Sequence, residues 1–154
     1  MSTTINLPGV VNAFNAHLDA VVAAIPDTSR PSLFLMGAPL READQFVRVV
    51  RMRYNQQRRT TTIDVHKAEL NVELAVGIAA GVAQTSYLKL HELISRLMLE
   101  LECKPLTLAD HELAIVAVPS AEIVPADEEP QTLLALLNIT VHAQRLSGNS
   151  IGNF

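Results

Sequence analysis

The sequence has little of what metal centres, disulfide scaffolds and nucleotide-hydrolysing enzymes require. Cys103 is the only cysteine in 154 residues, so the chain alone forms neither an internal disulfide nor a thiolate metal cluster. The six glycines are dispersed, and none precedes a Lys-Ser or Lys-Thr pair as in a phosphate-binding loop. Tryptophan is absent, and charged residues make up only 18% of the chain. A surface this weakly charged favours association, so we expect a partner to cover part of it.

Catalytic patterns are also missing from the local sequence. The five histidines are scattered, and only Asp64 and His66 place two metal ligands on one face of a strand, where an ordinary polar strand face is the simpler explanation. Cys103 stands between Leu101 and Pro105, which predicts a packed thiol near a helix end and not a nucleophile. No serine has nucleophile-elbow surroundings. We therefore predict a protein that is not an enzyme, with no catalytic residue, no metal site and no cofactor.

Neither a membrane segment nor a second domain is visible in the sequence. No run approaches the ~18 uninterrupted apolar residues that span a bilayer, and no basic segment precedes an apolar run near the start. Together with the single cysteine, this predicts a protein of a reducing, cytoplasmic compartment without membrane contact. The length predicts one domain, 1–146, and the small, polar residues of 147–154 predict a flexible C-terminal tail.

Two helices are predicted from apolar residues that recur every three or four positions. The first begins after the cap Asn6 and ends before Pro26. The second is capped by Thr85 or Ser86, continues to Glu102 and carries an apolar stripe on one side. Its charged side chains at three- and four-residue spacing indicate a solvated outer face. We expect both helices to pack against a sheet.

The clearest signal is strict alternation of apolar and polar residues from Ala68 to Ile78, which predicts a half-buried strand. Alternation continues upstream to Thr60, so we expect a long β arm or hairpin, with a bend or bulge near Lys67. Residues 39–54 fit either a helix or a strand, and their β-branched residues favour a strand from Phe46. Shorter strands are predicted at 33–36, 113–118, 122–124 and 137–144. These elements predict an α+β fold, with a mostly antiparallel sheet flanked by the two helices.

Charge is distributed unevenly along the chain. The segment 45–62 contains five arginines and no acid, whereas the chain from Glu100 onward is strongly acidic, including the turn-rich loop 125–130. Opposite patches on one subunit can meet head to tail around a ring. Two separately solvated faces are the plainer alternative, and the sequence leaves both interpretations open.

Two further classes of function stay open at this point. The arginines are suited to phosphate contacts and Tyr54 offers one stacking ring, but the chain carries a net charge of −4, so we expect at most incidental contact with DNA. The other class is an adaptor domain that binds a peptide or another protein through an exposed strand.

The order of elements is an apolar opening helix, an arginine-bearing β segment, the arm Thr60 to Ile78, the helix Tyr87 to Glu102, and closing strands that end in Leu137 to Val141. This order resembles that of the tail terminator and tail-completion (head-tail joining) proteins of tailed bacteriophages. The likeness covers Val10 to Gln144 and is one of element order and residue texture, since those families have no diagnostic short motif.

The resemblance implies a structural virion protein assembled in the cytoplasm of the bacterial host. Copies of the chain would form a ring, usually of six subunits, that caps the tail tube and joins it to the head or neck. The implied partners are other copies, the tail tube and sheath proteins, and the neck or connector protein, with incidental contact to DNA in the lumen. A neck or head-completion role is the alternative.

In such a ring, we expect affinity to come from pairing of edge strands and from apolar patches, while opposite charges select register. The resemblance assigns subunit or tube contacts to the basic segment and the arm. The candidate interface residues are Arg48, Arg51, Arg53, Arg58, Arg59, Lys67, Asp127, Glu128 and Glu129.

Overall fold

The structure, a computed structural model, describes residues 7–26, 29–39, 41, 43–60, 64–79, 83–103, 105–106, 108, 112–124 and 132–146. The helices in these ranges are α1 (Leu7–Ala23) and α2 (Ala83–Glu102). The strands are β1 (Ser32–Phe34), β2 (Gln45–Thr60), β3 (Asp64–Ala79), β4 (Glu112–Ile123) and β5 (Thr132–Leu146). The ambiguous segment therefore supplies a strand, and the predicted α+β class is confirmed.

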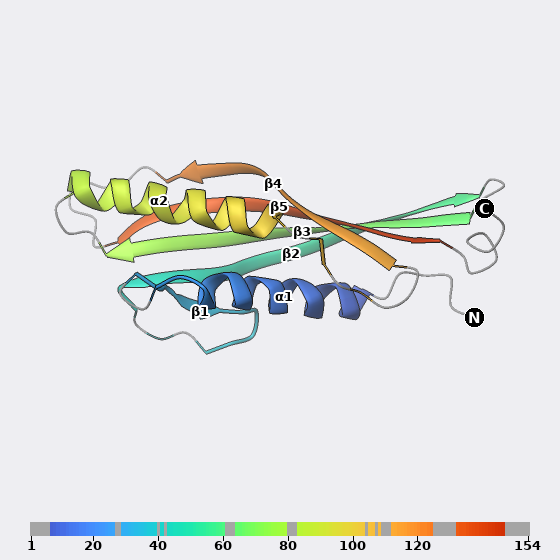
Figure 1. The fold of residues 1–154 in the computed structure, drawn as a ribbon, viewed down its shortest axis with the longest axis horizontal. Helices are drawn as coiled ribbons and strands as arrows, with labels where there is room; N and C mark the ends of the chain where they lie inside the picture. The colour runs from blue at the N-terminus through green and yellow to red at the C-terminus, as the bar shows by residue number, and fades with distance from the viewer. Residues whose placement is uncertain are drawn as a thin grey trace.

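The described strands form one sheet in the order β1-β2-β3-β5-β4. Only β1 runs parallel to its neighbour, and the other three pairings are antiparallel. Both helices lie on one face of this sheet, and the strands continue past them toward one end (Figure 1). At about 3.3 Å per residue, the 16-residue strands β2 and β3 are each about 50 Å long. We call the sheet face without helices the open face.

The predicted arm is a hairpin whose two strands pair along their whole length. β2 ends at Thr60 and β3 begins at Asp64, and these two residues are themselves paired. Thr60 is therefore the last residue of β2, whereas the sequence pattern assigns it to the same strand as Asp64. β5 pairs with β3 from Val65 to Ala79, so the arm is three strands wide along most of its length.

The core lies between the sheet and the two helices. The alternating apolar residues of β3, from Ala68 to Ile78, are all buried, as their period of two predicts. α1 covers them with a stripe that includes Phe14 and Leu18, both fully buried. His17 Nε2 donates a hydrogen bond of 2.9 Å to the carbonyl of Leu101. This contact joins the two helices and satisfies one of the carbonyls that the last turn of α2 leaves without a helical partner.

The bulge expected near Lys67 lies elsewhere, and that prediction is wrong. β3 pairs without interruption around Lys67, whereas β2 carries one extra residue, Val50, between the pairs of Val49 and Arg51. A bulge of this kind shifts the alternation of the strand by one position. Val47 and Val49 before the bulge are buried and Met52 after it packs against the same core, although strict alternation would separate them.

β4 is one strand where two were predicted. Its register against β5 shifts between Ala117 and Ser120, so Val118 and Pro119 together oppose a single residue. Proline lacks the N–H that a sheet ladder needs, and it is tolerated at a bulge on an edge strand. The strand therefore continues through Pro119 to Ile123 instead of ending before it.

Other boundaries differ because backbone pairing and packing extend elements beyond their side-chain patterns. α2 begins at Ala83, and Ser86, expected as a cap, is a buried residue inside the helix. β5 is longer than the predicted 137–144 because β3 offers it a partner along its full length. Cys103 does lie just beyond the end of α2, but it is exposed and not packed as predicted.

Gly77 provides a test of the sheet packing, because it lies opposite Phe46 and a Cβ there would overlap the Phe46 ring. We expect Gly77→Ala to lower the free energy of unfolding by about 1–3 kcal/mol, measured by urea denaturation. In a Phe46→Ala background the same change should be neutral or stabilising, since Ala in a strand is favoured over Gly by about 0.5–1 kcal/mol. Equal losses in both backgrounds would contradict this steric explanation.

Candidate assembly interface

The Val50 bulge brings Arg51 and Arg53 to the open face, where Arg48 also lies. Arg48 lies opposite Ala75, Arg51 opposite Glu73 and Arg53 opposite Asn71. All three arginines are exposed. Without the extra residue, Arg51 and Arg53 would share the face of Val47 and Val49, beneath the helices. The bulge thus separates a basic row from the apolar core.

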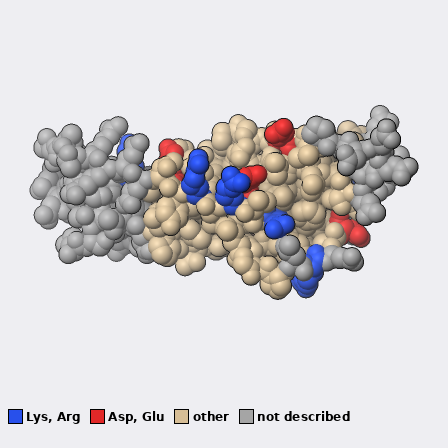
Figure 2. All heavy atoms as spheres, turned by 180° about the vertical axis from the view of Figure 1, so that it is seen from behind, with Lys and Arg blue, Asp and Glu red and all other residues tan. Residues whose placement is uncertain are grey.

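Acidic side chains lie beside this basic row on the same face. Glu73 on β3 approaches Arg51, with 4.0 Å between Arg51 Nε and Glu73 Oε2. The Arg51 side chain remains 72% exposed, so this contact leaves most of its charge in water. Figure 2, which views the molecule from behind, shows basic and acidic groups interspersed among uncharged atoms. In the part that the structure describes, the basic segment therefore faces outward together with acids of β3, not as a separate basic face.

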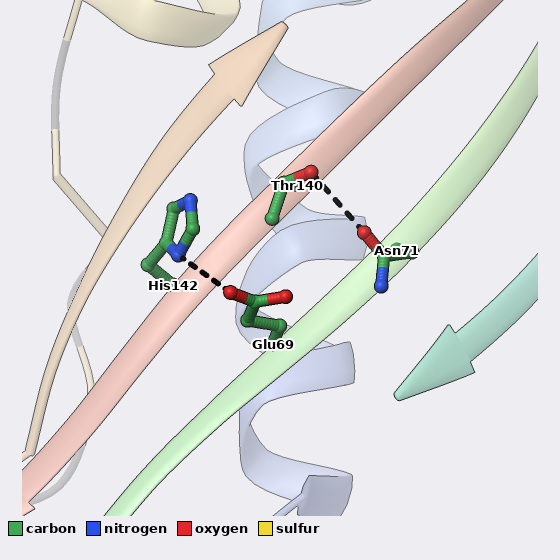
Figure 3. Close-up of polar contacts among 4 residues, drawn as sticks. All are labelled: Glu69, Asn71, Thr140 and His142. Carbon is green, nitrogen blue, oxygen red and sulfur yellow. Dashed lines mark hydrogen bonds and ion pairs between the residues drawn. The ribbon is translucent and has the colours of Figure 1, made fainter. Parts of the chain in front are cut away.

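A line of polar contacts crosses from β3 to β5 on the open face (Figure 3). The Thr140 hydroxyl donates to Asn71 Oδ1 at 3.2 Å, and His142 Nδ1 lies 3.6 Å from Glu69 Oε1. One strand further, Asn138 Nδ2 donates to Ser120 Oγ at 3.0 Å. Neighbouring polar side chains on paired strands stabilise a sheet and leave its surface wettable. These contacts explain the polar half of the alternation in β3 and β5.

Two shallow hollows lie on the open face. One, of about 300 Å³, crosses all four long strands and is bordered by Asn55, Lys67, Glu69, Ile115 and His142 among others. The second, of about 380 Å³, lies between the arginine row and the bulge of β4. Among the described residues, no group of three or more His, Cys, Asp or Glu side chains is arranged to hold a metal ion. No described helix is long and apolar enough to cross a membrane.

The remaining predicted residues are placed only in part. Lys67 lies on β3 and borders the first hollow. Arg58 and Arg59 pair through their backbones with His66 and Val65 near the end of the hairpin, and their side chains lie outside the described residues, as do those of Asp64 and His66. The loop 125–130, with its acids Asp127, Glu128 and Glu129, and the tail 147–154 also lie outside the described residues.

Two exposed apolar residues were missed as interface candidates. Tyr54 is 53% exposed on β2, and Ile115 is 54% exposed on β4. β2 and β4 are edge strands over the stretches that contain these residues. The sequence marks both residues as parts of strands, but it contains no signal for which strands lie at the edges.

The position of the arginines predicts that they contribute little to folding. We expect the triple variant Arg48→Gln, Arg51→Gln and Arg53→Gln to lose less than about 1 kcal/mol in free energy of unfolding, because exposed ion pairs contribute little. Val49→Gln is the matched control on the buried side of the same strand, and it should cost about 2 kcal/mol or more. Thermal and urea unfolding of both variants give the comparison. A triple variant as unstable as the Val49 variant would show that the arginines support the fold.

No protein-family model matches the chain, and no curated protein matches it. Solved structures do match the chain. The chain resembles a protein chain in the virion of a native gene transfer agent (GTA) particle, with a TM-score of 0.58 and 13% sequence identity. The alignment covers 90% of this chain and 98% of the other. A second solved chain, 11% identical and aligned over 93% of this one, has a TM-score of 0.48. At 13% identity, the likeness to the gene transfer agent chain shows a shared fold.

Proposed function

We propose that the chain is a structural protein of a phage-like virion, a tail terminator whose copies form a ring that caps the tail tube and joins it to the head or neck. The observation that carries this proposal is the fold, which matches a component of a gene transfer agent virion almost end to end, over 98% of that component. The ring and its six subunits follow from the resemblance of the element order to tail terminators.

The geometry supports a role in joining copies. The sheet is about 50 Å long in its longest strands, carries both helices on one face, and leaves the other face broad and polar. A protein with such a face and two exposed edge strands offers contacts on several sides, as a ring subunit requires. The exposed arginines of β2 supply charge that orients subunits against each other and against the tube.

The partners in this proposal are other copies of the chain, the tail tube and sheath proteins, and the neck or connector protein. The protein would be assembled in the cytoplasm of the host and retained in the virion tail, without a catalytic role. Arginines that face a lumen in the ring would also touch passing DNA, and such contact would weaken as salt concentration rises.

Size-exclusion chromatography with light scattering tests the ring directly. We expect the full chain at tens to hundreds of micromolar to reach the mass of six copies of the 16.8 kDa chain, about 101 kDa, and to appear as rings in negative-stain electron micrographs. A protein that stays monomeric across that range, alone and with tail tube protein added, would rule out the proposed ring.

Charge reversal tests the role of the arginine row. We expect Arg51→Glu with Arg53→Glu to reduce ring formation at least tenfold in concentration while changing the melting temperature little, because both side chains are exposed. Adding Glu73→Arg is the control. It restores an ion pair between positions 51 and 73 with the two charges exchanged, and it leaves the outward charge altered. Unchanged oligomer mass at an unchanged melting temperature would show that these arginines make no subunit contact.

A further inference from the structure

Among the described residues, the sheet has a free edge on each side. Within the described residues, β1 pairs only with Phe46–Arg48, so the outer edge of β2 has no strand partner from Val49 onward. On the other side, Leu106 bridges to Ala114 and donates its N–H to the Ala114 carbonyl at 3.0 Å. Beyond that bridge, the outer edge of β4 is without a described strand partner from Ile115 to Ile123.

These free stretches lie at the same height along the strands. The pairings across the sheet give two neighbouring rows. One row is Arg53, Asn71, Thr140 and Ala117, and the next is Asn55, Glu69, His142 and Ile115. Met52–Asn55 on β2 is therefore level with Ile115–Val118 on β4, at opposite edges of one subunit.

The two stretches also have suitable direction and regularity. The three antiparallel pairings between β2 and β4 mean that these strands run in opposite directions. Copies related by rotation about an axis along the strands keep their orientation, so β4 of one copy meets β2 of the next as an antiparallel pair. The bulges lie at the ends of the stretches: Val50 is just before the stretch on β2, and the stretch on β4 ends in the bulge of Val118 and Pro119. Pro119 lacks an N–H and so marks where such a pairing ends.

Each of the two edges exposes a large apolar side chain. Tyr54 and Ile115, each more than half exposed, lie inside the two stretches. An edge strand that exposes large apolar side chains is a template for adding another strand. Arg51 is level with Ser120, and Glu122 lies two residues further on the same face of β4. When the two edges pair, Glu122 lies diagonally across from Arg51 of the next copy and within reach of its side chain.

We infer that Met52–Asn55 of one copy pairs with Ile115–Val118 of the next, so that the sheet continues from subunit to subunit. This inference rests on the proposed ring and specifies its contact. Each copy uses both edges, β2 toward one neighbour and β4 toward the other, which is the head-to-tail arrangement that closes into a ring. The pairing would cover Tyr54 on the helix side, beside Val116 of the next copy, and Ile115 on the open face.

Disulfide cross-linking tests this contact without interference from links inside one chain. Arg53 and Ala117 are separated within a subunit by β3 and β5, a distance of about 14 Å at about 4.8 Å per strand. That distance is beyond the roughly 7 Å limit between Cα atoms for a disulfide, so any link joins two copies. Cys103 is the only native cysteine, and Cys103→Ser gives a cysteine-free background.

In that background, we expect the full chain with Arg53→Cys and Ala117→Cys to form a ladder of covalent oligomers on mild oxidation, ending at the ring size. Each single variant should give no ladder. The matched control, Arg53→Cys with Leu99→Cys, places the second thiol on an exposed position of α2 and should also give none. Placing the second cysteine at Ile115 or at Ser120 instead of Ala117 detects a pairing that is shifted by one row along the strands.

Light scattering of the same samples before oxidation separates the possible failures. Oligomers that form but give no ladder with any of the three β4 positions would overturn the edge pairing and leave the ring in place. Chains that remain monomeric by light scattering and give no ladder would overturn both the edge pairing and the proposed ring. A ladder of equal yield in the α2 control would show random collision, and that result would also overturn the edge pairing.

Discussion

β3 lies between β2 and β5 along almost its whole length, and the rest of the structure depends on its alternation. Its apolar side chains, from Ala68 to Ile78, all point to one face and are buried there beneath the helices. Each Å² of apolar surface removed from water contributes about 25 cal/mol to the free energy of folding. This buried face is therefore the main stabilising element of the sheet. A one-residue slip against either neighbour would expose it, so β3 holds the register of β2 and β5.

With that register held, the two bulges on the outer strands decide what each edge presents. Val50 moves Arg51 and Arg53 from the core side to the open face, and the bulge at Pro119 lets β4 continue past a residue that cannot donate to a ladder. Both bulges lie on strands with one free side, where an extra residue costs fewer ladder hydrogen bonds than in β3. The stretches that adjoin them, Met52–Asn55 after the bulge on β2 and Ile115–Val118 leading into the bulge on β4, are the parts of the edges suited to pairing.

The open face and the edges therefore have different roles. The open face carries polar contacts between β3 and β5, Thr140 with Asn71 and His142 with Glu69. These contacts keep the open face polar without a separate basic or acidic field. The exposed apolar side chains Tyr54 and Ile115 are on the edge strands instead. In the proposed ring, affinity comes from the edges, and the arginines that leave most of their charge in water select the orientation of neighbouring copies.

The α+β class, both helices and the buried row of β3 follow from the sequence alone, because periods of two and of 3.6 residues are local properties of the chain. The sequence also showed where the arginines cluster. Only the tertiary structure decided which face Arg51 and Arg53 occupy, since that depends on a single extra residue opposite β3. It also decided that β2 and β4 form the sheet edges where Tyr54 and Ile115 are exposed. Strand order is set by pairing between segments far apart in the chain and leaves no mark in local periodicity.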